Sequence, residues 1–377
     1  MNILYASLYN AKDKRNWSGT GYYISNMLKR QGIKVDYIGP LETTLNSRTK
    51  IYRKLCKIFN KKYHSFLDSS VANNYAQQVL NKINKNTDII FAPGSTPIAL
   101  LNTNKPKVYY TDATFASLHN FYNEYSNLSQ ITIKNGYYLE HKSLESSKLI
   151  LFSSEWAANA AIKNYKVDPR KIKVVPFGAN LECNRTMNDI KTIINLRSKK
   201  KLQLLFLGVD WVRKGGDVAL AITEKLNEMG IDATLNVVGI TELPLNINKK
   251  YIMNYGFINK TTKDGVDKLE KLLISSHFLL LPTIADCTPI VYSEVNSFGI
   301  PVITTNVGGI TTVIKDNVNG MTFGLNSEIS EWANYISKQF INSSNYENLC
   351  LSSFNEYETR LNWEVSGKKI YKLLKDL

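Results

Sequence analysis

Short apolar runs alternate with stretches of helical periodicity along most of this 377-residue chain. Strands that alternate with helices in this way are typical of parallel sheets with crossover helices, so the sequence predicts an α/β fold. In the first half, the predicted strands are short, buried runs rich in Val, Ile, Tyr and Phe: residues 2–8, 34–39, 87–94, 107–113, 148–154 and 172–178. Amphipathic stretches, such as residues 20–31 and 155–165, lie between several of them.

The series of strands is interrupted by a polar stretch at residues 180–201. It restarts with five further apolar runs, at residues 202–208, 233–239, 252–257, 277–283 and 301–306. We therefore predict two doubly wound, Rossmann-like domains, residues 1–178 and 200–355, and a closing helical segment over residues 356–377. Ligands bind such sheets at the carboxyl ends of strands, so we expect the two domains to face each other across a cleft lined by the functional motifs.

Charge is distributed unevenly along the chain, which has a formal net charge of +15. Residues 1–180 hold 25 Lys and Arg against 11 Asp and Glu, whereas the remainder holds 22 against 21. This asymmetry indicates an anionic partner for the first half, which could be nucleic acid, a membrane surface or a phosphorylated ligand. No zinc, RNP or helix-turn-helix motif supports nucleic acid, so no nucleic-acid partner is expected.

Features of the sequence that bear on location favour the cytoplasm. The four cysteines are widely scattered, which predicts free thiols rather than disulfides or a zinc site. No apolar run reaches 18 residues, so no transmembrane helix is expected. The first residues form a strand-like run without a preceding basic region, which is not the pattern of a signal peptide. Any membrane attachment is therefore expected to be peripheral, on the inner face.

Two acidic residues, Asp286 and Glu294, lie eight positions apart after a predicted strand. Pro289 suits the first turn of a helix and Gly299 suits its end, so Asp286 should lie in a strand-to-helix loop and Glu294 in the helix. Backbone N–H groups at the start of a helix can hold an anion, and a carboxylate can accept hydrogen bonds from sugar hydroxyls. The alternative is an ordinary surface glutamate and a loop aspartate.

The segment 282–320, PTIADCTPIVYSEVNSFGIPVITTNVGGITTVIKDNVNG, resembles the donor-site signature of retaining GT-B glycosyltransferases, especially family 4 (group 1). The resemblance is carried by residues in the same order and spacing as in that family: Asp286, Glu294, Gly299, Pro301, Val302, Gly308, Gly309 and Gly320. It implies that Glu294 binds the ribose hydroxyls of the donor and that Asp286 lies beside the transferred sugar. The family usually has Glu at the first acidic position, and it commonly has an acid where this chain has Thr312.

The turn between Asp286 and Glu294 is expected to present its backbone to the same ligand. It contributes the candidate substrate-binding residues Thr288, Pro289 and Ile290.

A second motif, residues 204–222, places two cations before a helix. The predicted strand ends at Gly208, and Arg213 and Lys214 immediately precede the glycine pair at which the helix begins. Two cations and free helix N–H groups suit a pyrophosphate, although a solvated basic turn is the alternative. The resembled family holds the donor phosphates with an Arg and a Lys; Lys214 matches that Lys, Val209 occupies the Arg position, and Arg213 is the candidate substitute.

The first half offers weaker motifs. Gly19 and Gly21 follow the first strand and would let the backbone approach a ligand closely, although a simple turn is the alternative. Asp112 lies at the end of a strand and is the best match to a polar residue that the resembled family places at the reaction centre. His119 is the alternative to Asp112. Ser154 is predicted to cap the helix that follows it.

Residues 49–66 form a basic amphipathic pattern, in which Ile51, Leu55, Ile58 and Phe59 alternate with lysine and arginine. Such a helix could lie on an anionic membrane surface. It could also pack on the N-terminal sheet with a solvated basic face. We favour packing on the sheet, because some apolar face must cover it.

The resemblance implies a retaining, metal-independent hexosyltransferase that needs no cofactor. A sugar would move from a nucleotide-diphosphate sugar, with UDP or GDP as the expected nucleotide, to a glycan or lipid-linked acceptor in cell-surface polysaccharide synthesis. The residues expected at the reaction centre are Asp112, Arg213, Lys214 and Asp286. The alternatives are a basic nucleic-acid- or membrane-binding protein, and an epimerase or phosphorylase of the same fold. A phosphorylase would need a pyridoxal lysine site, for which no motif is present.

Overall fold

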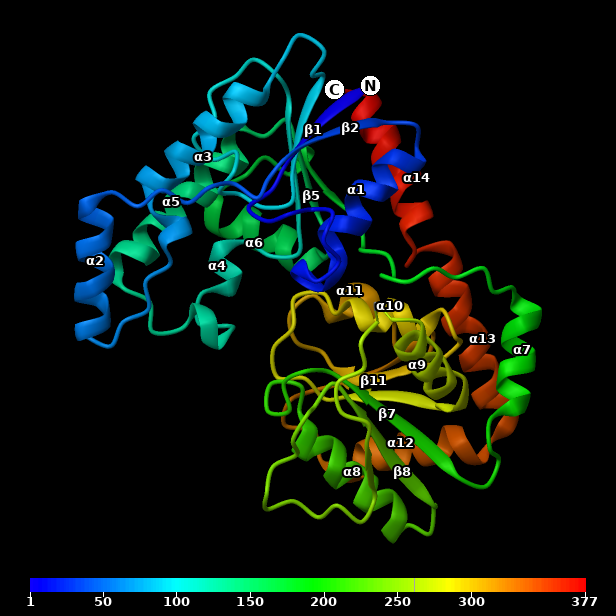
Figure 1. Cartoon of the computed structure of the whole chain (residues 1–377). Helices are drawn as coiled ribbons and strands as arrows, with labels where there is room; N and C mark the ends of the chain where they lie inside the picture. Colours follow the sequence, from blue (N-terminus) through cyan, green and yellow to red (C-terminus); the bar gives the residue numbers. More distant parts are fainter. Residues whose placement is uncertain (261) are drawn as a thin grey trace. The chain divides into compact units, whose positions relative to one another are not determined.

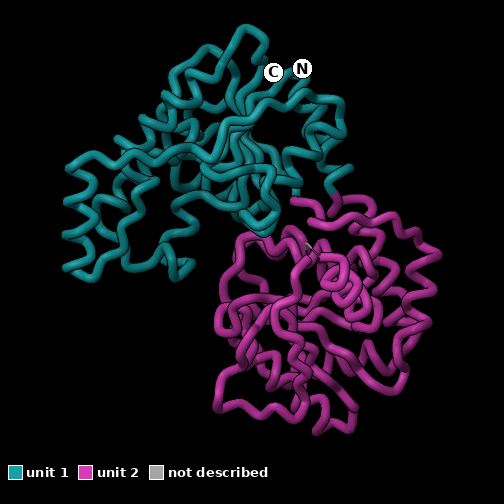
Figure 2. The backbone as a smooth tube through the Cα atoms, in the orientation of Figure 1, with its two compact units in different colours: residues 1–176, 363–377 teal, residues 177–362 magenta. Residues whose placement is uncertain are grey.

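The computed structural model describes residues 1–260 and 262–377 and divides the chain into two compact units. Unit 1 comprises residues 1–176 and 363–377, and unit 2 comprises residues 177–362 (Figure 2). Each unit is built on a six-stranded sheet whose strands pair in parallel, with helices on its flanks (Figure 1). The predicted α/β class and the two doubly wound sheets are therefore confirmed.

The sheet of unit 1 has the strand order β2-β1-β3-β4-β5-β6. Each strand lies within a predicted apolar run: β1 Asn2–Ala6, β2 Lys34–Ile38, β3 Ile89–Ala92, β4 Lys107–Thr111, β5 Leu149–Phe152 and β6 Ile172–Val174. The central strands β3, β4 and β5 are buried along their whole length, as expected when helices cover both faces of a parallel sheet.

The α-helices of unit 1 are α1 Thr20–Arg30, α2 Ser47–Ile58, α3 Ser69–Lys82, α4 Phe115–Leu118, α5 Gln130–Ser146, α6 Glu155–Tyr165 and α14 Trp363–Lys375. Ser154 caps α6 as predicted, because its hydroxyl accepts a hydrogen bond from the backbone N–H of Ala157 at 3.3 Å. The last helix, α14, packs beside α1 (Figure 1). The Ser366 hydroxyl on α14 also donates to the carbonyl of Pro176 at 2.8 Å.

The sheet of unit 2 has the order β12-β11-β10-β7-β8-β9. Five of its strands match predicted runs: β7 Leu202–Leu207, β8 Ala233–Val238, β9 Ile252–Asn254, β10 Phe278–Leu281 and β11 Val302–Thr305. The edge strand β12, Gly320–Phe323, was not predicted. It has four residues, begins with glycine and is only partly buried, so its sequence lacks a continuous apolar run.

The α-helices of unit 2 are α7 Met187–Leu196, α8 Gly216–Glu228, α9 Lys263–Ser275, α10 Ile290–Asn296, α11 Ile310–Val313, α12 Ile329–Ile341 and α13 Ser343–Thr359. The stretch that interrupts the predicted strands is not simply a connection, because it contains α7. A capping box begins this helix: the Thr186 N–H donates to the Asp189 carboxylate at 2.7 Å, and the Asp189 N–H donates back to the Thr186 hydroxyl at 3.3 Å. Ile190 and Ile193 are buried in the core of unit 2.

Helix α2 contradicts the prediction that its apolar side packs on the sheet. Figure 1 shows α2 at the outer margin of unit 1, beyond α3 and α5. Only Thr49 and Cys56 of this helix are buried, and its large apolar side chains are exposed to solvent. The face of the sheet is covered instead by other elements, with Val71, Tyr75 and Val79 of α3 contributing to the core.

Within residues 1–260 and 262–377, no helix has the length and apolar character needed to cross a membrane.

Candidate functional site

Two loops of unit 2 meet at the carboxyl ends of the strands in its sheet. Strands β7 and β10 are parallel neighbours, so the loops that follow them emerge at the same end. The backbone N–H of Ile284 in one loop donates to the carbonyl of Arg213 in the other at 2.9 Å. The Thr283 hydroxyl donates to the same carbonyl at 3.0 Å. These bonds fix the two motifs to each other.

Arg213, Lys214 and Asp286 come together where these loops meet. The Lys214 ammonium donates a short hydrogen bond to the Asp286 carboxylate, and both side chains are almost entirely buried. The Arg213 guanidinium lies 3.5 Å from the same carboxylate oxygen and donates to the carbonyl of Ala285 at 3.1 Å. Asp210 also faces Arg213, at 3.4 Å. The structure therefore brings together three of the residues predicted at the reaction centre.

The buried ammonium of Lys214 retains binding capacity. It carries three donors, and among the described residues only Asp286 accepts a hydrogen bond from it. A buried cation with unused donors, beside the start of the 13-residue helix α8, suits an anionic ligand such as a phosphate.

Glycines allow this close packing. Gly215 has a φ of +73°, and a Cβ built on it would lie 1.9 Å from the carbonyl oxygen of Pro282. A Cβ on Gly216 would lie 2.1 Å from the ring of Trp211, and one on Gly208 would lie 3.0 Å from the Lys214 side chain. The glycines therefore let the two loops and the Lys214 side chain pack at distances that no larger residue would allow.

Glu294 lies in the middle of α10 and is 5% exposed. Its carboxylate accepts a hydrogen bond from Lys260 at 2.7 Å, with the Lys260 side chain about half exposed. A carboxylate has about four acceptor positions, so this ion pair leaves room for ligand hydroxyls. Sequence reasoning missed Lys260, which is 34 positions from Glu294 and belongs to no recognised motif.

Helix α10 is fixed to the sheet below it. The Tyr292 hydroxyl lies 2.6 Å from that of Thr304 on β11, which in turn donates to the carbonyl of Leu281 on β10 at 2.8 Å. Burial, and secondarily the Asp286 carboxylate, raises the pKa of the Tyr292 hydroxyl well above its ordinary value, so it stays protonated. Pro289 is the N-cap of α10, which places Thr288 and Ile290 on either side of the helix start.

The remaining predicted residues lie in unit 1. Gly19 has a φ of +84° and precedes α1, and Gly21 lies in its first turn. A Cβ on Gly21 would lie 2.8 Å from the ring of Tyr9. Asp112 directly follows β4. Burial, and next the charge of Asp112, raises the pKa of the Tyr9 hydroxyl. Tyr9 therefore packs against Gly21 and also interacts electrostatically with Asp112.

Tyr9 itself was missed by sequence reasoning. Its hydroxyl is buried and has no hydrogen-bond partner among the described residues. A buried hydroxyl without a partner is costly, so it is a further candidate for contact with a ligand. The only signal in the sequence was its position a few residues after the first strand.

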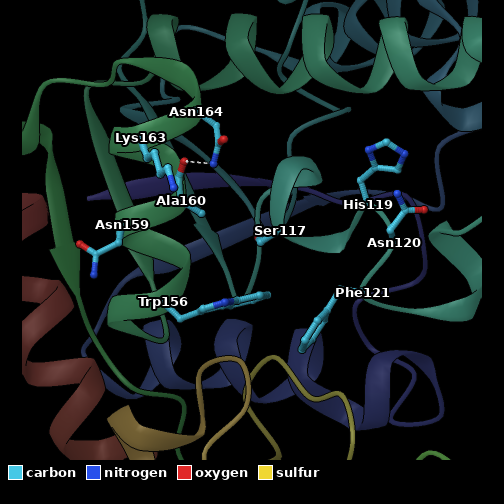
Figure 3. A pocket seen from close by; sticks show the side chains of 9 residues that line it. All are labelled: Ser117, His119, Asn120, Phe121, Trp156, Asn159, Ala160, Lys163 and Asn164. Atoms are coloured by element: carbon cyan, nitrogen blue, oxygen red, sulfur yellow. Dashed lines mark hydrogen bonds between the residues drawn. The ribbon is translucent and has the colours of Figure 1, made fainter.

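His119, the alternative to Asp112, ends helix α4 and lines a separate open hollow of about 500 Å³ in unit 1. Figure 3 shows the side chains around this hollow: Ser117, His119, Asn120, Phe121, Trp156, Asn159, Ala160, Lys163 and Asn164. The rings of Phe121 and Trp156 have centroids 5.1 Å apart and are tilted by 42° to each other. Aromatic faces beside amide and ammonium groups form a surface that can contact both the apolar faces and the hydroxyls of a sugar.

All four cysteines are free. Among the residues that the structure describes, no group of three or more His, Cys, Asp or Glu side chains is arranged to hold a metal ion.

Comparison with known proteins finds a family match over part of the chain and the same fold in solved structures. Residues 188–350 match the family model "Glycosyl transferases group 1". An uncharacterized 41.2 kDa protein in the cps region of Klebsiella pneumoniae is 25% identical over 225 residues, which are 59% of this chain and 58% of that protein. The UDP-Gal:alpha-D-GlcNAc-diphosphoundecaprenol alpha-1,3-galactosyltransferase of Escherichia coli is 26% identical over 209 residues, covering 52% and 53%.

The matches thus span little more than half the length of these curated relatives. Among solved structures, Anabaena Alr3699/HepE in complex with UDP superposes with a TM-score of 0.66 at 15% identity, covering 100% of both chains. Residues 188–350 are therefore similar to the group 1 glycosyltransferases, and the two parallel six-stranded sheets give the chain the GT-B fold.

Proposed function

We propose that the protein is a retaining glycosyltransferase that moves a hexose from a nucleotide-diphosphate sugar to a glycan or lipid-linked acceptor in cell-surface polysaccharide synthesis. The observation that carries this proposal is the meeting of Arg213 and Lys214 with Asp286, at the sheet edge from which α10 also presents Glu294. Two cations suited to phosphate and the buried carboxylate of Glu294, at the same end of the sheet, would fit the diphosphate and the ribose of a nucleotide donor.

The donor diphosphate would lie against Lys214, Arg213 and the first N–H groups of α8. Lys214 has unused donors for its oxygens, and the carboxylate of Asp286 holds the ammonium in place until the ligand arrives. Glu294 would accept hydrogen bonds from the ribose hydroxyls while Lys260 neutralises its charge. UDP is the favoured nucleotide, because the E. coli relative is named for UDP-Gal and the Anabaena structure contains UDP.

In the proposed reaction, the bond between the anomeric carbon and the diphosphate oxygen breaks, and the acceptor oxygen bonds to that carbon from the same face. The departing phosphate oxygen is the nearest base on that face, so it takes the proton of the acceptor hydroxyl. Lys214 and Arg213 would stabilise the charge that develops on the diphosphate, which is why we propose that no metal ion is required. Asp286 would contact the sugar rather than act as a nucleophile.

The aromatic hollow of unit 1 is our candidate for the acceptor sugar. Trp156 and Phe121 offer ring faces, and Asn159 and Lys163 border them with polar groups. The E. coli relative is named for an acceptor that joins a sugar to a lipid diphosphate. We propose an acceptor of the same class, in which a sugar is the group recognised here.

Binding of the donor can be tested with a thermal-shift panel of UDP, GDP, ADP and their sugar conjugates, at fixed salt and with a chelator present. A ligand at a hundred times its dissociation constant should stabilise the fold by roughly 2.7 kcal/mol. We expect a clear shift with UDP and UDP-sugars that is lost in Glu294→Ala and retained in the exposed control Glu228→Ala. The absence of a shift with every nucleotide would contradict the proposed donor site.

Replacing Trp156 with alanine should raise the KM for acceptor about two- to tenfold, because one aromatic contact is worth roughly 0.5–1.5 kcal/mol, while leaving the KM for donor unchanged. Trp156→Phe should restore most of the loss. The matched control is Tyr138→Ala, which removes another partly exposed aromatic ring of unit 1, away from the hollow. Steady-state kinetics with each substrate varied in turn would measure both constants, and equal effects of the two alanine variants would exclude the hollow as the acceptor site.

A further inference from the structure

Helix α2 carries an apolar surface that the rest of unit 1 leaves uncovered. Ile51 is 58% exposed, Leu55 44%, Ile58 75% and Phe59, which follows the helix, 72%. We call these four side chains, together with the neighbouring Lys50, Lys54 and Lys57, the α2 surface. Single exposed apolar residues are common, but four within nine positions form a patch of the kind that marks an interaction site.

The spacing places these apolar side chains on one face of the helix. Ile51, Leu55 and Ile58 are separated by four and three positions, which aligns them along a helix. Thr49 and Cys56, the buried residues of α2, lie on a different face that contacts unit 1. The helix therefore has one side bound to the protein and another apolar side turned outward.

Basic residues border the apolar face, and no acidic residue lies among them in the sequence. Between Glu42 and Asp68 the sequence contains no Asp or Glu. The same stretch contains the basic residues Arg48, Lys50, Arg53, Lys54, Lys57, Lys61 and Lys62. Three of these lysines are exposed, and each directly precedes an apolar residue of the patch: Lys50 before Ile51, Lys54 before Leu55 and Lys57 before Ile58. A partner for this surface must accept apolar side chains and positive charge together.

Hydrogen bonds hold both ends of the helix. At its start, the Asn46 side chain accepts from the Thr49 N–H at 2.8 Å and donates to the Ser70 hydroxyl at 3.1 Å. After its end, the Asn127 side chain donates to the carbonyl of Asn60 at 2.7 Å. The exposure of the apolar side is therefore a feature of the fold, because the helix is fixed at both ends.

We propose that the α2 surface binds the protein to an anionic phospholipid membrane. The surface of such a membrane offers lipid phosphates for the lysines and an acyl boundary for Ile51, Leu55, Ile58 and Phe59, which is the pair of chemistries that the helix presents. Lysine side chains can extend to the head groups while the apolar residues insert. The proposal goes beyond the transfer reaction and does not depend on the donor site, which nucleotide binding tests separately.

The test is co-sedimentation of the full chain with phosphatidylcholine vesicles that contain about one third phosphatidylglycerol, compared with pure phosphatidylcholine vesicles. The first variant, Lys50→Gln/Lys54→Gln/Lys57→Gln, should bind the anionic vesicles about a hundredfold more weakly, because each lysine near an anionic surface contributes about fivefold. The second variant, Ile58→Ser/Phe59→Ser, should lose binding by a similar factor. All five positions are exposed, so both variants should keep the melting temperature of the parent.

A matched control is Lys199→Gln/Lys200→Gln/Lys201→Gln, which removes the same charge from three exposed lysines of unit 2 and should bind the vesicles as the parent does. Equal binding by the parent and both α2 variants would overturn the proposal, as would equal binding to anionic and neutral vesicles. A concentration-dependent dimer of the parent that the Ile58→Ser/Phe59→Ser variant abolishes, without vesicle binding, would assign the surface to a second copy of the chain instead.

Discussion

Lys214→Ala is expected to lower kcat/KM for sugar transfer by about 10²–10³-fold, the loss typical when one group that stabilises developing negative charge is removed. Lys214 is the buried cation of the candidate donor site and has donors to spare for a phosphate. The matched control is Lys225→Ala on α8, the helix that begins two residues after Lys214; the Lys225 ammonium is paired with Glu228 on the surface. Transfer assays with the purified variants would measure the difference.

Removing Lys214 also leaves the buried Asp286 carboxylate with the more distant Arg213 as its one remaining cation among the described residues. An uncompensated buried charge destabilises a fold, so part of the activity loss could come from instability. Lys214→Ala/Asp286→Asn separates the two effects, because it removes both charges. We expect this double variant to regain thermal stability while remaining inactive. Recovery of activity together with stability would show that Lys214 is a structural residue.

The strands were the most predictable part of this fold. Buried parallel strands are continuous apolar runs, so the pattern of apolar residues located eleven of them. Strand β12 gave no such signal, because it begins with glycine, contains a polar residue and is only partly buried. Helix α2 shows the opposite case. Its amphipathic pattern predicted a helix correctly, but the pattern does not specify what its apolar side contacts, and the structure leaves that side exposed.

Site residues were predictable where the chain itself brings them together in a short motif. Arg213 and Lys214 precede a helix, and Asp286 follows the neighbouring strand, so their meeting follows from strand order. Lys260 and Tyr9 were missed because their roles come from contacts made only after folding. Lys260 reaches Glu294 from the segment before α9, and Tyr9 lies against Gly21 from the loop after β1.

Gly215→Ala should destabilise the protein far more than an alanine at another glycine of the same backbone conformation. Gly215 has a φ of +73°, which costs an L-residue about 1–2 kcal/mol, and its Cβ would lie 1.9 Å from the Pro282 carbonyl oxygen. Gly230 has a φ of +84°, but no atom lies within 4 Å of its Cβ position, so Gly230→Ala serves as the matched control for the backbone cost alone.

We expect Gly215→Ala to cost at least about 3 kcal/mol, or about 6–12 °C in Tm for a unit of this size, and Gly230→Ala to cost only the backbone's roughly 1–2 kcal/mol. The added methyl group must displace either the start of α8 or the loop after β10, and these two segments carry Lys214 and Asp286. The affinity for UDP should therefore fall in Gly215→Ala and remain unchanged in Gly230→Ala. Thermal unfolding and nucleotide titration of the two variants would measure both effects. Equal Tm losses would mean that the carbonyl of Pro282 can move away freely, and the close approach of the loops would then not be what positions the donor site.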